Sequence, residues 1–258
     1  MSSVPERSAV IYVVSHLEGR EEEIVGHRWV YAGEAGRRRQ TSSLTDVCTT
    51  GASLENSRWS ELSAIYKIWK EGPRTDVVGF CHYRRFFAFG AETGSGPVIN
   101  IKKSDLQKKF PENWDKILDR VDFEHSIVPE RFDLGKNVYA HYLEFHNSRD
   151  YIEVMNAAVK MDPQLRHFIV EQFSKRQMYA CNMFIMAWEN FDALCRFWFG
   201  VLQPFAEAKP WPRENAYQSR DVSFLAERLF DAWICHKQST GHSLLHVPMY
   251  FVKETAEG

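Results

Sequence analysis

The sequence predicts an α/β fold in which a mixed, mostly parallel sheet is flanked by helices. Two observations predict it. Short apolar runs of strand type recur along the chain, and amphipathic helical patterns separate them. The strand-type runs are AVIYVV (9–14), TDVVGF (75–80) and YACNMFIM (179–186). Near-continuous apolar runs of this kind are typical of strands that are buried on both faces of a sheet.

The composition is that of an ordinary globular protein, with 44% hydrophobic and 26% charged residues. A chain of 258 residues can bury a sizeable core, and we expect a single domain over residues 1–258. The formal net charge of −2 argues against a nucleic-acid-binding protein, which normally carries a basic surplus. We therefore expect no nucleic acid among its partners.

Cysteine usage and hydropathy indicate the compartment. The five cysteines are widely spaced and form no CxxC pair, which predicts a reducing environment with neither a disulfide scaffold nor a zinc site. No apolar run approaches the length that spans a bilayer, and the N-terminus lacks a signal-peptide core. We expect a cytoplasmic protein that works near the inner face of the membrane. The three arginines at 37–39 are either a mobile surface loop or a contact for an anionic substrate or an acidic membrane surface.

The first strand-type run ends at His16, at the carboxyl end where open α/β sheets bind their ligands. His16 is therefore a candidate ligand contact, although an ordinary surface histidine would fit the same pattern. A second short strand is expected at 29–32. The polar segment 33–56 that follows is too long for an ordinary connection, which predicts a disordered stretch or an active-site loop. Its candidate ligand contacts are Asp46, Ser53 and Asn56.

From Trp59 the pattern becomes helical. Apolar residues recur on one face at the spacing of an amphipathic helix through Trp69, and Asn56 or Ser57 can cap its start. Glu61 lies among apolar neighbours on this helix. A carboxylate in such a place needs a partner, and the Arg84-Arg85 pair is the obvious one. The alternative is a surface glutamate in the first helical turn.

The strand-type run 75–80 leads directly into the cluster CHYRRFF (81–87). His82, Tyr83, Arg84 and Arg85 therefore stand at the carboxyl end of a strand. Two arginines and a histidine among aromatic residues predict a cationic pocket for a phosphorylated ligand, because guanidinium groups match phosphate oxygens in two-point geometry. The alternative is a solvated charge pair at a strand end.

The second half of the chain alternates helical and strand patterns. We expect a polar helix over 102–121, a short strand at 126–129 and a helical stretch that carries His141, His146 and Asp150. The five-residue spacing of the two histidines does not place them together on a helix face, which weakens a metal site. His146 and Asp150 have the spacing of an i,i+4 pair, in which the carboxylate could orient the imidazole.

Three further patterns complete the chain. Asn182 interrupts the apolar run 179–186, so its amide must find partners in the core or bind a sugar hydroxyl. The helix over 222–236 carries Glu227 at the margin of its apolar stripe, where a raised pKa and a general-base role become possible, and Arg228 away from the centre of the stripe. The tail 242–251 predicts a final edge strand.

Four common catalytic or cofactor-binding motifs are absent from the sequence. It contains no GxxxxGK[ST], GxGxxG, HExxH or GxSxG sequence. The phosphate-loop, dinucleotide, metalloprotease and serine-hydrolase explanations therefore lose their support.

Taken together, these segments resemble the bacterial capsular and exopolysaccharide biosynthesis proteins regarded as GT-A-like glycosyltransferases, a family long catalogued as a domain of unknown function. The matching segments, which cover nearly the whole chain, are Asp46 with Asn56, SELSAIYKIWK (60–70), DVVGFCHYRRFF (76–87), NVYAHYLEFH (137–146), CNMFIM (181–186) and FLAERLFDAWI (224–234). The segment 33–56 departs most from the family pattern.

The resemblance implies transfer of a sugar from a UDP-sugar to a glycan or lipid-linked glycan, with galactofuranose as one specific donor sugar. It also implies a nucleotide-binding half over 9–100 and an acceptor-side half over 101–258. Under it, the donor and its diphosphate contact His16, Asn56, His82, Tyr83, Arg84, Arg85 and Arg228. The sugar or acceptor contacts Asn182, His146 and Asp46.

The GT-A pattern usually places an Asp-x-Asp metal site after the strand that matches 76–80, and this sequence has His82-Tyr83-Arg84 there. We therefore expect no metal and no cofactor, with positive side chains neutralising the diphosphate. An inverting transferase needs a carboxylate base, for which Glu227 is the first candidate and Glu61 the second. Two alternatives remain: a metal-independent phosphodiesterase or phosphotransferase, and a non-catalytic nucleotide-sugar-binding subunit.

Overall fold

The computed structural model describes residues 7–18, 24–38, 44–91, 96–110, 115–212 and 214–253. The strands are β1 Ala9–Ser15, β2 His27–Tyr31, β3 Val77–His82, β4 Arg85–Phe87, β5 Val98–Lys102, β6 His125–Pro129, β7 Phe132–Asp133, β8 Gln177–Met178, β9 Phe184–Ala187, β10 Ser243–Val247 and β11 Met249–Lys253. The helices are α1 Gly33–Arg38, α2 Asn56–Trp59, α3 Leu62–Glu71, α4 Leu106–Lys109, α5 Asp115–Leu118, α6 Val138–Leu143, α7 Ser148–Met161, α8 Arg166–Glu171, α9 Trp188–Ala208 and α10 Asp221–Ser239.

Within these residues a nine-stranded mixed sheet forms the centre of the molecule. Its main path is β10-β6-β9-β3-β4-β11-β5, and β1 joins β3 to the outer strand β2. The longest pairings are parallel: β1 with β2 and with β3, β10 with β6, and β11 with β5. The predicted mixed, mostly parallel sheet is therefore present.

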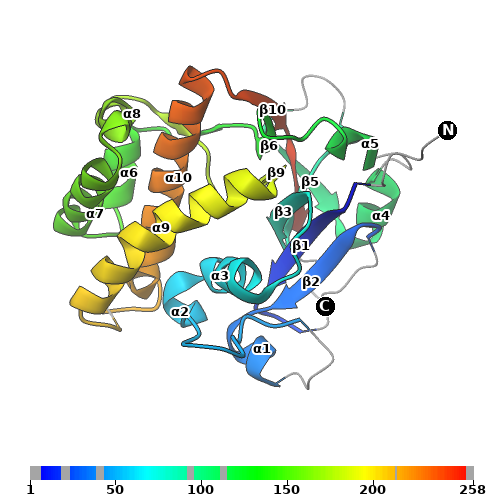
Figure 1. Ribbon diagram of the computed structural model, residues 1–258, viewed down its shortest axis with the longest axis horizontal. Helices are drawn as coiled ribbons and strands as arrows, with labels where there is room; N and C mark the ends of the chain where they lie inside the picture. The colour runs from blue at the N-terminus through cyan, green and yellow to red at the C-terminus, as the bar shows by residue number, and fades with distance from the viewer. Residues whose placement is uncertain are drawn as a thin grey trace.

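Both faces of the sheet are covered, as the apolar strands predicted. Side chains alternate along β1, so that Tyr12 packs with α3, α9 and α10 on one face while Ile11 and Val13 pack with residues near α4 and α5 on the other. Figure 1 shows α9 and α3 beside the strands, and α6, α7, α8 and α10 gathered at the side remote from the chain termini. The long helices thus leave the carboxyl ends of β1 and β3 to the loops.

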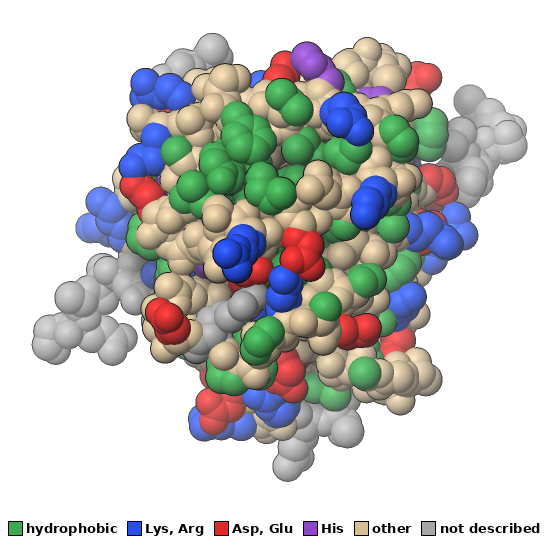
Figure 2. Space-filling model, turned by 90° about the vertical axis from the view of Figure 1, so that its left-hand side faces the viewer, with side chains coloured by type: hydrophobic (Ala, Val, Ile, Leu, Met, Phe, Trp, Pro, Cys, Tyr) green, Lys and Arg blue, Asp and Glu red, His purple; other side chains and the backbone are tan. Residues whose placement is uncertain are grey.

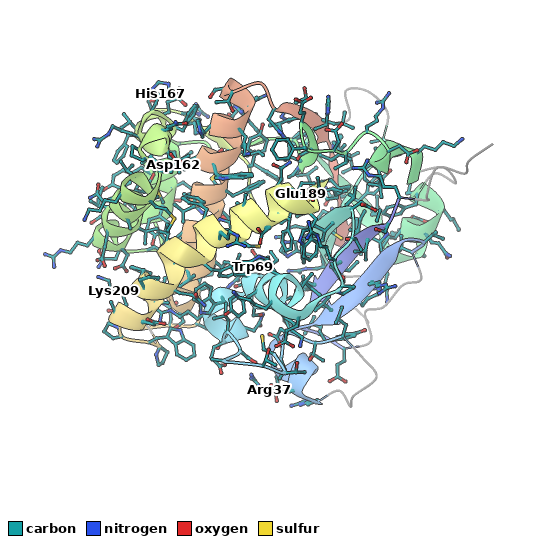
Figure 3. The ribbon with its side chains drawn as sticks, in the orientation of Figure 1. Arg37, Trp69, Asp162, His167, Glu189 and Lys209 are labelled. Carbon is teal, nitrogen blue, oxygen red and sulfur yellow. The ribbon has the colours of Figure 1, made fainter. Side chains whose placement is uncertain are left out.

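The helix α3 is fastened to α9 through Trp69, which Figure 3 labels between the two helices. The Trp69 indole N–H donates to Asp192 Oδ1 at 2.8 Å, and its ring stacks on Phe199 with centroids 5.6 Å apart. The apolar face predicted from Trp59 onward is therefore buried against α9. This contact fixes the position of α3, which begins one residue after Glu61.

Four predicted elements differ from the structure. The segment 33–56 contains α1, which carries Arg37 and Arg38, while the third arginine of that run lies outside the described residues. The helix expected over 102–121 is broken, because Phe110, which precedes a proline, is extended.

The strand expected over 179–186 begins only at Phe184, because Cys181 and Asn182 adopt positive φ angles of 73° and 47°. The tail forms two strands separated by Pro248. Of these, β10 is at an edge of the sheet, but β11 lies inside it between β4 and β5.

One face of the helical side carries exposed apolar residues. Figure 2 shows a group of hydrophobic side chains on the face that Figure 1 places at α6, α7 and α8. The exposed large apolar residues of these helices and the turns after them are Leu143, Phe145, Ile152, Met161, Val170 and Phe173. No helix among the described residues is long and apolar enough to cross a membrane.

Candidate active site

A pocket of about 260 Å³ opens at the carboxyl ends of β1 and β3. These strands are parallel neighbours, with Val14 opposite His82, so the residues that follow them converge at one edge of the sheet. The pocket is lined by Val14, His16, Ala32, Asn56, Ser57, Ser60, Glu61, His82, Tyr83, Arg84, Arg85 and Arg220. The structure therefore brings together His16, Asn56, Glu61 and the whole 82–85 cluster.

The arginines of the cluster are placed by a tight hairpin. Strand β3 ends at His82 and β4 begins at Arg85, which faces His82 in an antiparallel pair. The guanidinium of Arg84 lies 5.1 Å from the centre of the Tyr83 ring, and that of Arg85 lies 5.7 Å from the Phe251 ring. Aromatic rings thus support both cations at the pocket wall.

Arg220 supplies a third guanidinium that the sequence patterns did not indicate. Its Nε donates to Ser60 Oγ at 2.9 Å across 160 residues of chain. Ser60 itself has a positive φ of 48°, a backbone conformation that costs on the order of 1–3 kcal/mol and often marks functional sites. Arg220 belongs to no recognisable sequence motif and stands alone in a polar segment before α10. Only the folded structure shows that it lies at the pocket.

The position of Arg220 depends on a buried ion pair next to it. Arg58 Nε lies 3.2 Å from Asp221 Oδ1, and Arg58 Nη1 donates to the Ala206 carbonyl at 2.8 Å. The two side chains are only 8% and 3% exposed. This pair joins α2 to the start of α10 and so holds Arg220 beside Ser60.

We expect Asp221→Ala to lower the free energy of unfolding by about 3–5 kcal/mol, because it leaves the Arg58 charge buried without its carboxylate partner. Urea denaturation measures the loss. The matched control is Glu189→Ala, which removes an ion pair to Arg74 whose side chains are 70% and 55% exposed, and it should cost at most about 1 kcal/mol. Equal losses in the two variants would contradict this view of the pair.

Glu61 is the carboxylate of the pocket. It is 9% exposed and accepts a hydrogen bond from Asn182 Nδ2 at 2.6 Å. Burial raises the pKa of Glu61, while the Asn182 amide and the charges of Arg220 and Arg85 act in the opposite direction. Of the expected partners Arg84 and Arg85, Arg85 is one of the charges that act on Glu61, and Arg220 is the other.

His82 lines the pocket but does not add to its positive charge. Burial and the neighbouring Arg85 lower the pKa of His82 to about 3, so the imidazole is neutral near pH 7. Its Nε2 lies 2.6 Å from the Cys181 carbonyl oxygen, which can only accept, so Nε2 carries the hydrogen. The expectation that His82 adds to the positive charge of the pocket is therefore wrong. That charge comes from Arg84, Arg85 and Arg220.

A turn behind the pocket links both candidate bases. Asn182 is fully buried and does not line the pocket. Its amide contacts Glu61 from behind the wall, which corrects its expected contact with a sugar hydroxyl. The Cys181 N–H donates to Glu227 Oε1 at 2.7 Å, and the Cys181 carbonyl accepts from His82. Glu227, the first predicted base, is not among the lining residues of the pocket; it contacts the turn at Cys181, and its side chain is 17% exposed.

Three other predicted contacts lie outside this pocket. Arg228 is 1% exposed and is held by Glu227 Oε2 at 2.8 Å and by His141 Nδ1 at 3.0 Å, so it is not placed to touch a diphosphate in the pocket. Asp46 is buried, and it accepts from the Gly33 N–H and the Ser63 hydroxyl. His146 lines a second cavity, and Asp150, its expected partner, lies 3.7 Å from Lys209.

The donor atoms of the pocket do not suit a divalent cation. Mg²⁺ and Mn²⁺ require several oxygen ligands, usually carboxylates. Of the described lining residues only Glu61 is a carboxylate, and three arginines, Arg84, Arg85 and Arg220, line the same pocket. Among the described residues there is also no cluster of three His, Cys, Asp or Glu side chains that could hold a metal ion. The side chains that line the pocket include three arginines, the residue type whose guanidinium groups pair with phosphate oxygens.

These features define an α/β protein with an arginine-lined pocket at the carboxyl edge of its sheet. The structure is similar to that of WbbM, a bifunctional glycosyltransferase, in its apo form, with a TM-score of 0.84 and 25% sequence identity over 96% of this chain. The chain spans 46% of that protein's length. The predicted GT-A-like fold is confirmed by this likeness.

The family follows from the sequence of nearly the whole chain. Residues 10–238 match the model described as Domain of unknown function (DUF4422), and the chain belongs to this family. The resemblance inferred from the segments around CHYRRFF and AERLF is therefore confirmed. No curated protein is detectably similar to the chain.

Proposed function

We propose that the protein is a glycosyltransferase that moves a sugar from a UDP-sugar to a glycan or lipid-linked glycan during synthesis of a bacterial capsule, O-antigen or exopolysaccharide. The likeness to WbbM supports sugar transfer in general. The observation that carries the proposal is the pocket that is lined by three arginines and one buried carboxylate, Glu61. Such a pocket can hold a diphosphate leaving group and a base side by side.

The arginines provide the electrostatic part of the mechanism. As the bond between the anomeric carbon and the diphosphate oxygen breaks, negative charge grows on the diphosphate, and Arg84, Arg85 and Arg220 stabilise it. His82 donates its Nε2 hydrogen to the Cys181 carbonyl and so anchors the hairpin. His16, Tyr83 and Asn56 complete the donor side of the pocket.

Glu61 is the base that the geometry favours. In an inverting transfer, its carboxylate takes the proton of the acceptor hydroxyl while that oxygen attacks the anomeric carbon opposite the leaving diphosphate. Asn182 positions the carboxylate through its 2.6 Å hydrogen bond. Glu227 is the second candidate, because it accepts a hydrogen bond from the Cys181 N–H, in the turn whose Cys181 carbonyl oxygen contacts His82.

We propose that no metal takes part, and we expect transfer to persist at the same rate, within about twofold, in excess EDTA. The physical reason is that fixed guanidinium charges perform the neutralisation for which other enzymes use Mg²⁺. Product formation after exhaustive chelation measures this. Loss of turnover that Mn²⁺ restores would reject metal independence.

A donor panel tests the function. The protein is incubated with UDP-, GDP- and dTDP-sugars, UDP-galactofuranose included, with and without glycan acceptors, and release of nucleoside diphosphate is followed. We expect UDP release that depends on a glycan acceptor. Nucleotide cleavage without any sugar acceptor would indicate a phosphodiesterase, and UDP binding without turnover of any donor would indicate a non-catalytic subunit.

The proposed partners follow from this activity. They are the UDP-sugar and the glycan or lipid-linked acceptor, with no nucleic acid. We place the reaction in the cytoplasm, at the inner face of the membrane, where nucleotide sugars and lipid-linked glycans meet.

A further inference from the structure

A second cavity of about 360 Å³ lies where the turn between α6 and α7 meets the loop before α10. It is lined by His146, Asn147, Pro212, Glu214 and Gln218. The size falls within the range of small-molecule sites, and the lining offers an imidazole, two amides and a carboxylate. These groups both donate and accept hydrogen bonds, which is what recognition of sugar hydroxyls requires.

Exposed aromatic rings gather around this cavity. The Tyr217 ring stacks on the His146 ring with centroids 5.7 Å apart. Its centroid lies 5.2 Å from that of Phe145, in an edge-to-face arrangement. Tyr217 and Phe145 are 44% and 46% exposed although they touch each other. Trp211, next to Pro212 in the cavity wall, is 37% exposed. Large aromatic surface left open beside clustered polar groups is typical of a ligand site.

Phe224 connects this cavity to the arginine pocket. Its ring packs against Tyr217 at 5.0 Å and against His146 at 4.5 Å. The Arg220 guanidinium lies 5.5 Å from the centre of the Phe224 ring, and Arg220 lines the first pocket. Phe224 therefore contacts a lining residue of each cavity, Arg220 of the first and His146 of the second.

We propose that the second cavity is a subsite for the glycan acceptor, which binds an oligosaccharide remote from its reacting end. The exposed rings of Tyr217 and Phe145 pack against the apolar faces of sugar rings, while Asn147, Glu214 and Gln218 bond to hydroxyl groups. A chain held there extends past Phe224 and delivers its terminal hydroxyl beside Glu61. This inference rests on the proposed function, and it gives His146 its predicted place on the acceptor side.

The test measures binding to an array of immobilised short neutral oligosaccharides, with UDP binding followed separately by calorimetry. The variants are Tyr217→Ala, whose exposed ring can be removed without opening the core, and Glu214→Gln. The control is Val170→Ala, an apolar residue that is 60% exposed on α8. We expect Tyr217→Ala to weaken binding of the best oligosaccharide at least about tenfold, with UDP affinity unchanged. Glu214→Gln should weaken it less, and Val170→Ala should not change it.

The outcomes separate this inference from the proposed function. Wild-type protein that binds UDP but no oligosaccharide, or variants that bind oligosaccharides as the wild type does, would overturn the subsite and leave the donor site standing. Oligosaccharide binding that depends on Tyr217 in a protein that fails to bind UDP would support the subsite and count against the transferase.

Discussion

Replacing Arg85 by Gln is expected to lower the rate of sugar transfer by about 10²–10³-fold and to weaken UDP binding. Arg85 lines the pocket beside Glu61 and is held by its strand pairing with His82. Removing one preorganised donor from a site where charge develops has this magnitude in enzymes. Arg85→Lys keeps the charge but loses the two-point geometry, so we expect an intermediate loss.

Steady-state kinetics with the donor found in the panel, together with calorimetry of UDP binding, measures this effect. Arg166→Gln is the matched control, because it removes an exposed arginine of α8 far along the chain from the pocket residues, and it should leave both quantities unchanged. An Arg85→Gln variant with normal turnover and normal UDP affinity would show that the arginine pocket does not hold the diphosphate.

The sequence predicted the fold class and half of the pocket because both depend on local patterns. Buried strands are continuous apolar runs, and the residues that follow β1 and β3 meet wherever these strands pair in parallel. His16 and the 82–85 cluster could therefore be assigned to one site from their positions at strand ends. Asn56 could be proposed because it ends the long polar segment 33–56, and Glu61 because a carboxylate among apolar neighbours needs a partner.

The remainder could not be predicted because it depends on long-range contacts. Arg220 reaches the pocket through Ser60 and through the Arg58–Asp221 pair, and none of these residues carries a motif. Cys181 and Asn182 have the pattern of a strand, but positive φ angles turn Asn182 behind Glu61. The neutral state of His82 follows from burial, which a strand-end position does not reveal.

Replacing Glu61 by Gln is expected to lower transfer by about 10²–10⁴-fold while UDP affinity stays nearly intact. The amide cannot take the acceptor proton, but it preserves the shape and the contact with Asn182. In the wild type, the rate should fall as pH drops through the pKa of Glu61, at a pH above the ordinary glutamate value of 4.5, because burial raises that pKa. The pH profile of kcat/KM measures this.

Glu61→Gln should also stabilise the fold, whereas the corresponding substitution of Glu227 should destabilise it. A carboxyl whose pKa is raised by folding favours the folded state when protonated, and this contribution is lost as pH rises through the raised value. Glu61→Gln mimics the protonated form, so its melting temperature should exceed that of the wild type at neutral and alkaline pH, with the difference vanishing in acid.

Glu227→Gln should do the opposite. It takes the charged partner from Arg228, which is 1% exposed, and we expect a loss of about 1–3 kcal/mol in the free energy of unfolding. If Glu227 only positions the turn at Cys181, its glutamine variant should retain transfer within about tenfold of wild type. A Glu227→Gln protein that folds but loses transfer by orders of magnitude, beside a Glu61→Gln protein that keeps it, would assign the base to Glu227 instead.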